Sequence, residues 1–100
     1  MKWGIDETRL VEAVLALETP EETRKFLRDL MTEGEIVEFS KRLRAAEMLS
    51  GKVPYATIEK ETGLSSTTVA RVSKWLNKGT GGYRKIITRL HHGHTRPIVK

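Results

Sequence analysis

The sequence predicts an all-α protein of about six helices. Apolar residues recur at three- and four-residue steps along most of the chain, no segment alternates between apolar and polar residues as a strand would, and helix-start signals precede several of the periodic segments. A chain of 100 residues is long enough for one domain with a modest core, which we place at residues 1–90. The absence of cysteine fits a reducing cytoplasm and excludes thiol catalysis and cysteine-ligated metals.

Three helices are predicted before residue 51. Asp6 is placed to cap the first helix, and Thr19 is placed to cap the second, with Glu22 as its capping-box acid. Thr32 begins a similar capping box for the third and longest helix, which Gly51 ends. The residues expected on the buried faces of these helices are Leu10, Val11, Val14 and Leu15; Phe26, Leu27 and Leu30; and Ile36, Phe39, Leu43 and Ala46.

The stretch from Tyr55 to Leu76 predicts a helix-turn-helix at about residues 54–77. Gly63 supplies a residue free to take a positive φ where the first helix must stop, and Ser65 is placed to cap the second helix. The residues expected to hold the two helices together are Ile58, Leu64, Val69, Val72 and Leu76. A packed αα-hairpin without a binding function is the alternative interpretation.

The exposed face of the second motif helix begins with small hydroxyl side chains and continues with cations. Such a face fits a DNA major groove, because short polar side chains let the backbone come close to the base edges. The residues predicted to contact DNA are Ser65, Ser66, Thr67, Thr68, Ala70, Arg71 and Lys74.

Charge divides the chain inside this motif. Residues 1–61 carry 10 basic and 13 acidic side chains, whereas residues 62–100 carry 8 basic and no acidic side chains. The basic part attracts a polyanion, because binding releases the counterions condensed on that polyanion. We expect double-stranded DNA rather than a membrane, since the chain has no long apolar run and its basic segment has no strongly apolar face.

One more short helix is predicted after the motif. Residues 77–82 are too rich in glycine to continue the second motif helix and are interpreted as a linker. The apolar residues that then recur at helical spacing are Tyr83, Ile86, Ile87 and Leu90. Residues 91–100 form a basic tail that we expect to be flexible. Because His91, His92 and His94 have no carboxylate or thiol nearby, we predict that the tail contacts DNA phosphates and holds no metal.

From Leu30 to Asn77 the chain resembles the Trp repressor superfamily. LMTEGEIVEF is similar to the start of that family's central helix, KRLRAAEMLSGK to its basic continuation and ETGLSSTTVARVSKWLN to its DNA-reading motif. The YerC/YecD group of Trp repressor-like proteins is a closer match, in FLRDLMTEGEI, in YATIEKETG and in LNKG followed by Tyr83, over about residues 8–90. The resemblance implies an all-helical fold, an intertwined homodimer whose N-terminal helices cross between subunits, and regulation of transcription at operator DNA.

The resemblance also suggests where an effector would bind. In Trp repressor, a tryptophan co-repressor lies between the central and reading helices, held by two arginines whose positions match Arg42 and Arg71 here. The chain departs from that pocket at Val72, where the repressor has glycine, and at Trp75, where it has a serine that meets the ligand. Trp75 either fills the volume of free tryptophan or is an ordinary half-buried aromatic residue. On either interpretation we expect no cofactor and no response to tryptophan.

These observations predict a repressor-like, sequence-specific regulator of transcription that binds double-stranded DNA as a homodimer, in the cytoplasm and on the nucleoid. Three helices ahead of the motif exceed what it needs for support, which favours a two-fold dimer with reading helices about 34 Å apart over a monomer. The alternative function is a dimeric helical adaptor that binds a protein or RNA. We do not expect an enzyme, because no histidine or acid stands at a sequence spacing from the motif's serines and threonines that suggests their activation.

Overall fold

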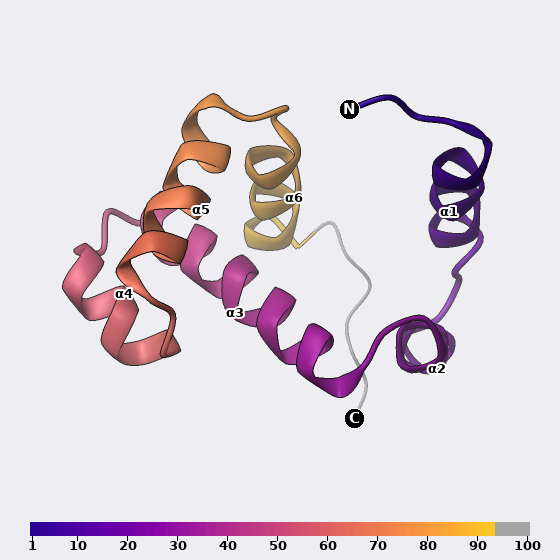
Figure 1. Cartoon of the computed structure of the whole chain (residues 1–100), viewed down its shortest axis with the longest axis horizontal. Helices are drawn as coiled ribbons and strands as arrows, with labels where there is room; N and C mark the ends of the chain where they lie inside the picture. The colour runs from indigo at the N-terminus through magenta and orange to yellow at the C-terminus, as the bar shows by residue number, and fades with distance from the viewer. Residues whose placement is uncertain (94–100) are drawn as a thin grey trace. The chain divides into compact units, whose positions relative to one another are not determined.

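The computed structural model describes residues 1–93, which form six α-helices and no strand (Figure 1). The helices are α1 (Ile5–Leu15), α2 (Pro20–Leu30), α3 (Glu33–Ser50), α4 (Tyr55–Thr62), α5 (Ser66–Lys78) and α6 (Gly82–His91). The predicted all-α class is thereby confirmed. Contacts within the chain divide it into two units, residues 1–33 and residues from Gly34 onward, and each unit is described by itself.

The first unit consists of α1 and α2. The N–H of Gly4, the residue before α1, donates to Glu7 Oε1 over 3.0 Å, whereas Asp6 lies inside the first turn, so the predicted Asp6 cap is wrong. The start of α2 is as predicted, because the Thr19 hydroxyl accepts from the Glu22 N–H over 3.1 Å. Local side-chain signals therefore set where both helices begin.

The predicted buried faces of α1 and α2 are not buried within the first unit, residues 1–33. Neither helix contains a buried residue. Leu10, Val11 and Val14 are 41–50% exposed, and Leu15 is 78% exposed. The helical periodicity is correct, but the first unit by itself does not bury the apolar face that it creates.

The second unit is centred on α5, against which both α4 and α6 pack. Its buried core consists of Ala45, Ala46, Ile58, Leu64, Val69, Val72, Leu76 and Ile87. This set contains all five residues predicted to join the helices of the helix-turn-helix. The two alanines come from α3, and both are fully buried.

The end of α3 depends on a residue that the sequence did not single out. The helix stops at Ser50, directly before Gly51, as predicted, but the left-handed residue is Lys52, at φ 65°. The Lys52 N–H donates to the Leu49 carbonyl oxygen over 3.0 Å, and the N–H of the following residue donates to that of Met48 over 3.0 Å. These bonds form a Schellman motif, in which glycine usually occupies the place of Lys52.

The linker between α5 and α6 is shorter than predicted. Asn77 and Lys78 belong to α5, which ends at Lys78. At Gly79, the cap residue that follows, a Cβ would overlap the Trp75 carbonyl oxygen. In α6, the predicted apolar residue Ile87 is buried. Among residues 1–93, no helix is both long and apolar enough to cross a membrane. Residues 94–100 of the predicted tail, which include His94, lie outside the described residues.

Candidate nucleic-acid interface

A buried hydroxyl holds the turn between α4 and α5. Gly63 takes φ 75°, the left-handed conformation that the sequence predicts. Thr62 is only 5% exposed; its hydroxyl donates to the Ile58 carbonyl oxygen over 2.7 Å and accepts from the Leu64 N–H over 3.2 Å. This role of Thr62 was not predicted, although a threonine directly before the turn glycine is a signal that would indicate it.

The first turn of α5 separates capping residues from residues free to contact a ligand. The Ser65 hydroxyl accepts from the Thr68 N–H over 3.2 Å and donates to the Thr68 hydroxyl over 3.0 Å. Ser65 and Thr68, which were both predicted to contact DNA, are therefore engaged in the helix cap. Ser66, Thr67 and Ala70 are exposed, so the start of α5 presents two free hydroxyl side chains and one methyl group to solvent.

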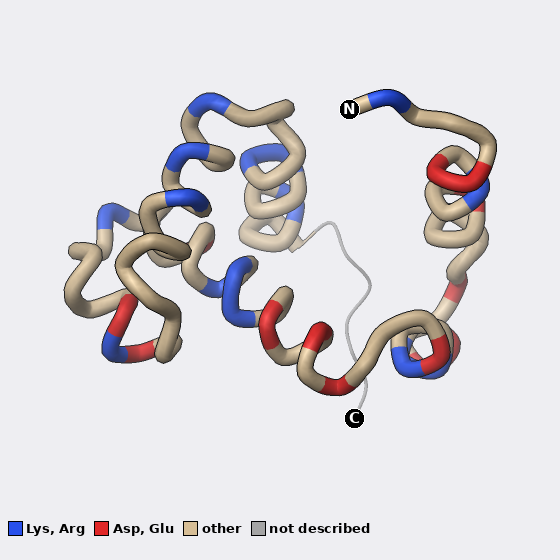
Figure 2. Tube along the Cα trace, in the orientation of Figure 1, with Lys and Arg blue, Asp and Glu red and all other residues tan. Residues whose placement is uncertain are grey.

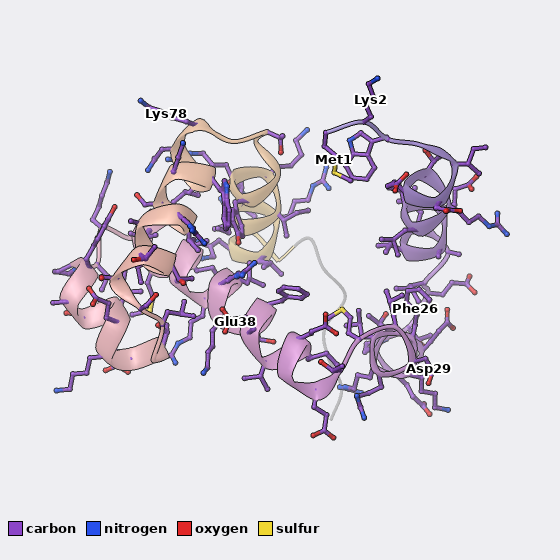
Figure 3. All side chains as sticks on the ribbon, in the orientation of Figure 1. Met1, Lys2, Phe26, Asp29, Glu38 and Lys78 are labelled. Carbon is purple, nitrogen blue, oxygen red and sulfur yellow. The ribbon has the colours of Figure 1, made fainter. Side chains whose placement is uncertain are left out.

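Cations continue the exposed face of α5. Arg71 and Lys74 are exposed, and within residues 1–93 neither side chain makes an ion pair or a hydrogen bond. Lys78 extends away from the end of the helix (Figure 3). Lys and Arg are the only charged residues on α5 and α6, whereas α4 carries acids as well (Figure 2). The exposed face of α5 is therefore polar at its start, cationic further along and free of carboxylates.

A side-chain contact links α3 to α4. Arg44 Nη1 donates to the Glu61 carbonyl oxygen over 3.2 Å, and Arg44 Nη2 lies 3.5 Å from Glu61 Oε2. Both side chains are half exposed, so the ion pair itself contributes little, about 0.2–1 kcal/mol. Its effect is on geometry, because it joins the end of α4 to the long helix.

Aromatic rings surround Arg42 on α3. Its guanidinium carbon lies 5.4 Å from the centre of the Phe39 ring and 5.9 Å from that of Trp75. Its Nε lies 3.6 Å from Glu38 Oε2, one helical turn earlier, and is shielded from solvent without a hydrogen bond. The expectation that Phe39 lies in the core is wrong: Phe39 is 45% exposed, and this arginine covers part of its ring. Burial raises the pKa of Tyr83, and the nearby Arg42 charge lowers it by a smaller amount.

The four residues expected at an effector pocket lie in three different environments. Arg42 and Trp75 are together, and Trp75 remains 43% exposed. Val72 is fully buried in the core, so its side chain is not available to a ligand, while Arg71 is on the exposed face of α5.

Of the histidines within the described residues, His91 is the last residue of α6, although it was expected in the tail, and His92 caps the helix. His91 Nε2 lies 3.6 Å from Glu47 Oε2 of α3, so the expectation that no carboxylate lies near His91 is wrong. Among residues 1–93, no group of three or more His, Cys, Asp or Glu side chains is arranged to hold a metal ion.

Comparison with known proteins gives a consistent set of relatives. Residues 6–91 match the family described as Trp repressor protein. The uncharacterized protein YerC of Bacillus subtilis is 36% identical over 97 residues, which span 97% of this chain and 93% of that protein. A crystal structure of a TrpR-like protein from Eubacterium eligens matches with a TM-score of 0.84 and 32% identity, over 97% of this chain and 95% of the other. A putative Trp repressor from Staphylococcus aureus matches with a TM-score of 0.84 and 38% identity, over 91% and 95%.

Proposed function

The chain belongs to the Trp repressor family, whose members are DNA-binding regulators rather than enzymes, and on this basis we propose that it is a sequence-specific, repressor-like regulator of transcription. It acts on double-stranded DNA on the nucleoid, as a homodimer, with α5 as its reading helix. The observation that carries the proposal is the face of α5, where exposed Ser66 and Thr67 precede Arg71 and Lys74, cations without an ion-pair partner among residues 1–93.

Each part of that face has a separate role in DNA binding. The small side chains of Ser66, Thr67 and Ala70 permit close approach to base edges, where direct or water-mediated hydrogen bonds distinguish sequences. Arg71 and Lys74 supply charge for phosphates, which adds affinity without sequence preference. The Thr62 hydroxyl and the Ser65 cap fix the angle and the start of α5, so the reading side chains are held in place before DNA arrives.

The exposed stripe of α1 supports the homodimer. Leu10, Val11 and Val14 form an apolar helix face that a second copy can cover. We expect the protein to sediment as a dimer, and Val14→Glu, which places a charge in the stripe, to shift it toward the monomer. Glu12→Gln, outside the stripe, is the matched control. A parent protein that sediments as a monomer at every concentration tested would refute the dimer.

DNA binding can be tested by comparing one reading residue with one phosphate-contacting residue. Bound fragments selected from genomic DNA should yield a site preferred over random duplex by about a thousandfold or more at near-physiological salt. Thr67→Ala should change the order of preference among related sites. Lys74→Ala should weaken binding to all sequences alike and reduce the salt dependence by about one phosphate contact. Weak, uniform binding by the parent protein would instead favour the adaptor function.

Tryptophan should have no effect on this binding. The Arg42 guanidinium already lies against two aromatic rings of its own chain, and the Val72 side chain is fully buried in the core, where a ligand does not reach it. We therefore expect the DNA affinity to be the same with and without L-tryptophan. A tenfold increase in affinity, which corresponds to about 1.4 kcal/mol of coupling, would contradict this part of the proposal.

A further inference from the structure

A small polar cavity of about 250 Å³ lies between the α3–α4 turn, α5 and α6. Its polar lining consists of Ser50, Lys52, Tyr55, Ser73, Asn77 and Arg84. Within α5, the lining residues Ser73 and Asn77 are one turn apart, and Trp75, two residues from each, does not share their face. The cavity is therefore distinct from the surroundings of Arg42.

Hydrogen bonds hold one wall of the cavity in place. Arg84 Nη2 donates to Asn77 Oδ1 over 2.6 Å. The Asn77 amide in turn donates to the Ser73 carbonyl oxygen over 2.9 Å, and its nitrogen lies 3.4 Å from the Ser73 hydroxyl. Because an arginine side chain has five N–H donors, the contact with Asn77 leaves others available to a ligand. The guanidinium is thus oriented at the cavity before anything binds.

Lys52 supplies the second cation, from an unfavourable backbone conformation. It occupies the left-handed place of a Schellman motif at φ 65°, where glycine would be more stable. A non-glycine residue in a sparsely populated conformation at the edge of a cavity is a feature that often accompanies binding sites. Here the consequence is an ammonium group on the α3–α4 turn, bordering the same cavity as Arg84 on α6.

We propose that this cavity binds a phosphate group, with Lys52 and Arg84 as its charged ligands. The lining contains two cations, three hydroxyl groups and an amide, and no carboxylate, so it favours an anion. An arginine fork together with a lysine ammonium matches the oxygens of a phosphate. The volume is below the roughly 300–1,000 Å³ of cavities that enclose drug-sized ligands, which fits a single phosphate group. That group belongs either to the DNA backbone or to a small phosphorylated molecule.

The test uses the full-length protein, inorganic phosphate as the probe, and three variants. Lys52→Gly removes one cation and relieves the left-handed strain, so loss of binding cannot be attributed to unfolding. Arg84→Gln removes the other cation, and Lys85→Gln, next to it on α6 but outside the lining, is the matched control. Phosphate is titrated at constant ionic strength while backbone amide chemical shifts are recorded, and duplex-DNA affinity is measured against salt concentration.

Binding of free phosphate should shift the amides of Ser50, Ser73 and Asn77, and each cavity variant should weaken it at least about tenfold, whereas Lys85→Gln should not. If the DNA backbone is the source, both cavity variants should also reduce the salt slope by about one phosphate contact, and the control should not. The proposal is overturned if both cavity variants match the control in both measurements. Because the phosphate titration contains no DNA, it tests the cavity even if the proposed regulatory function fails.

Discussion

Two left-handed residues bracket α4, and substitutions at them should change stability in opposite directions. Gly63 has φ 75° and Lys52 has φ 65°. In the left-handed region, a residue with a Cβ lowers the free energy of unfolding by about 1–2 kcal/mol through steric strain. Glycine avoids that strain but lowers the free energy of unfolding by about 0.4–1 kcal/mol, because it gives the unfolded chain more conformational freedom. The difference between these two effects gives the expected change at each site, about 1 kcal/mol.

Gly63→Ala should lower the free energy of unfolding by about 1 kcal/mol, and Lys52→Gly should raise it by about the same amount. Steric overlap adds nothing at Gly63, since the nearest atom to an added Cβ is the flexible Lys41 Nζ, 3.9 Å away. For a domain of this size, 1 kcal/mol corresponds to about 4–8 °C in the melting temperature.

Thermal and urea denaturation at equal protein concentrations measure both changes. Lys52→Ala is the control at that site: it removes the ammonium but keeps a Cβ, so it should bring no gain in stability. If Lys52→Gly were less stable than the parent protein, or if Lys52→Ala gained as much as Lys52→Gly, the assignment of backbone strain to Lys52 would be wrong.

Two further predictions concern the same unit. Thr62→Val removes the acceptor of the buried Leu64 N–H and should lower the free energy of unfolding by about 1–3 kcal/mol, whereas Thr62→Ser keeps the hydroxyl and should lose less in urea denaturation. Burial raises the pKa of Tyr83 in the folded protein above its ordinary value of 10.0. The neutral side chain therefore contributes stability that is fully present below pH 10.0 and is lost as the pH rises through the higher folded-state pKa. Tyr83→Phe should therefore lose less stability in denaturation series above pH 10.0, and an equal alkaline loss in parent and variant would contradict this.

The helix-turn-helix could be predicted because its signals are local. Gly63 and Ser65 act on residues next to them in the chain, and the apolar positions of α5 recur at fixed steps on a single helix. Such signals depend on backbone geometry and short-range hydrogen bonds, which the order of residues largely determines. The face expected to contact DNA follows directly from them.

The remaining features depend on contacts between distant residues or on groups outside the chain. Arg42 and Trp75 lie on different helices, and no local pattern indicates that the guanidinium contacts that ring. At the end of α3, Gly51 and Lys52 are neighbours, and which of them takes the left-handed conformation depends on how the next helix is placed. Periodicity predicted the apolar stripe of α1 but could not say whether the same chain covers it.

The exposed apolar stripe of α1 links the oligomeric state of the protein to its concentration in the cell. α1 has 11 residues and none of them is buried, and an isolated helix shorter than about 12–15 residues is only marginally stable in water. In the proposed homodimer, a second chain supplies the missing cover, so the ordered fraction of α1 rises with the number of chains present. The cellular concentration of the protein would then affect regulation. At low expression the amides of α1 would exchange rapidly with solvent, and the two reading helices would be paired only above a threshold protein concentration.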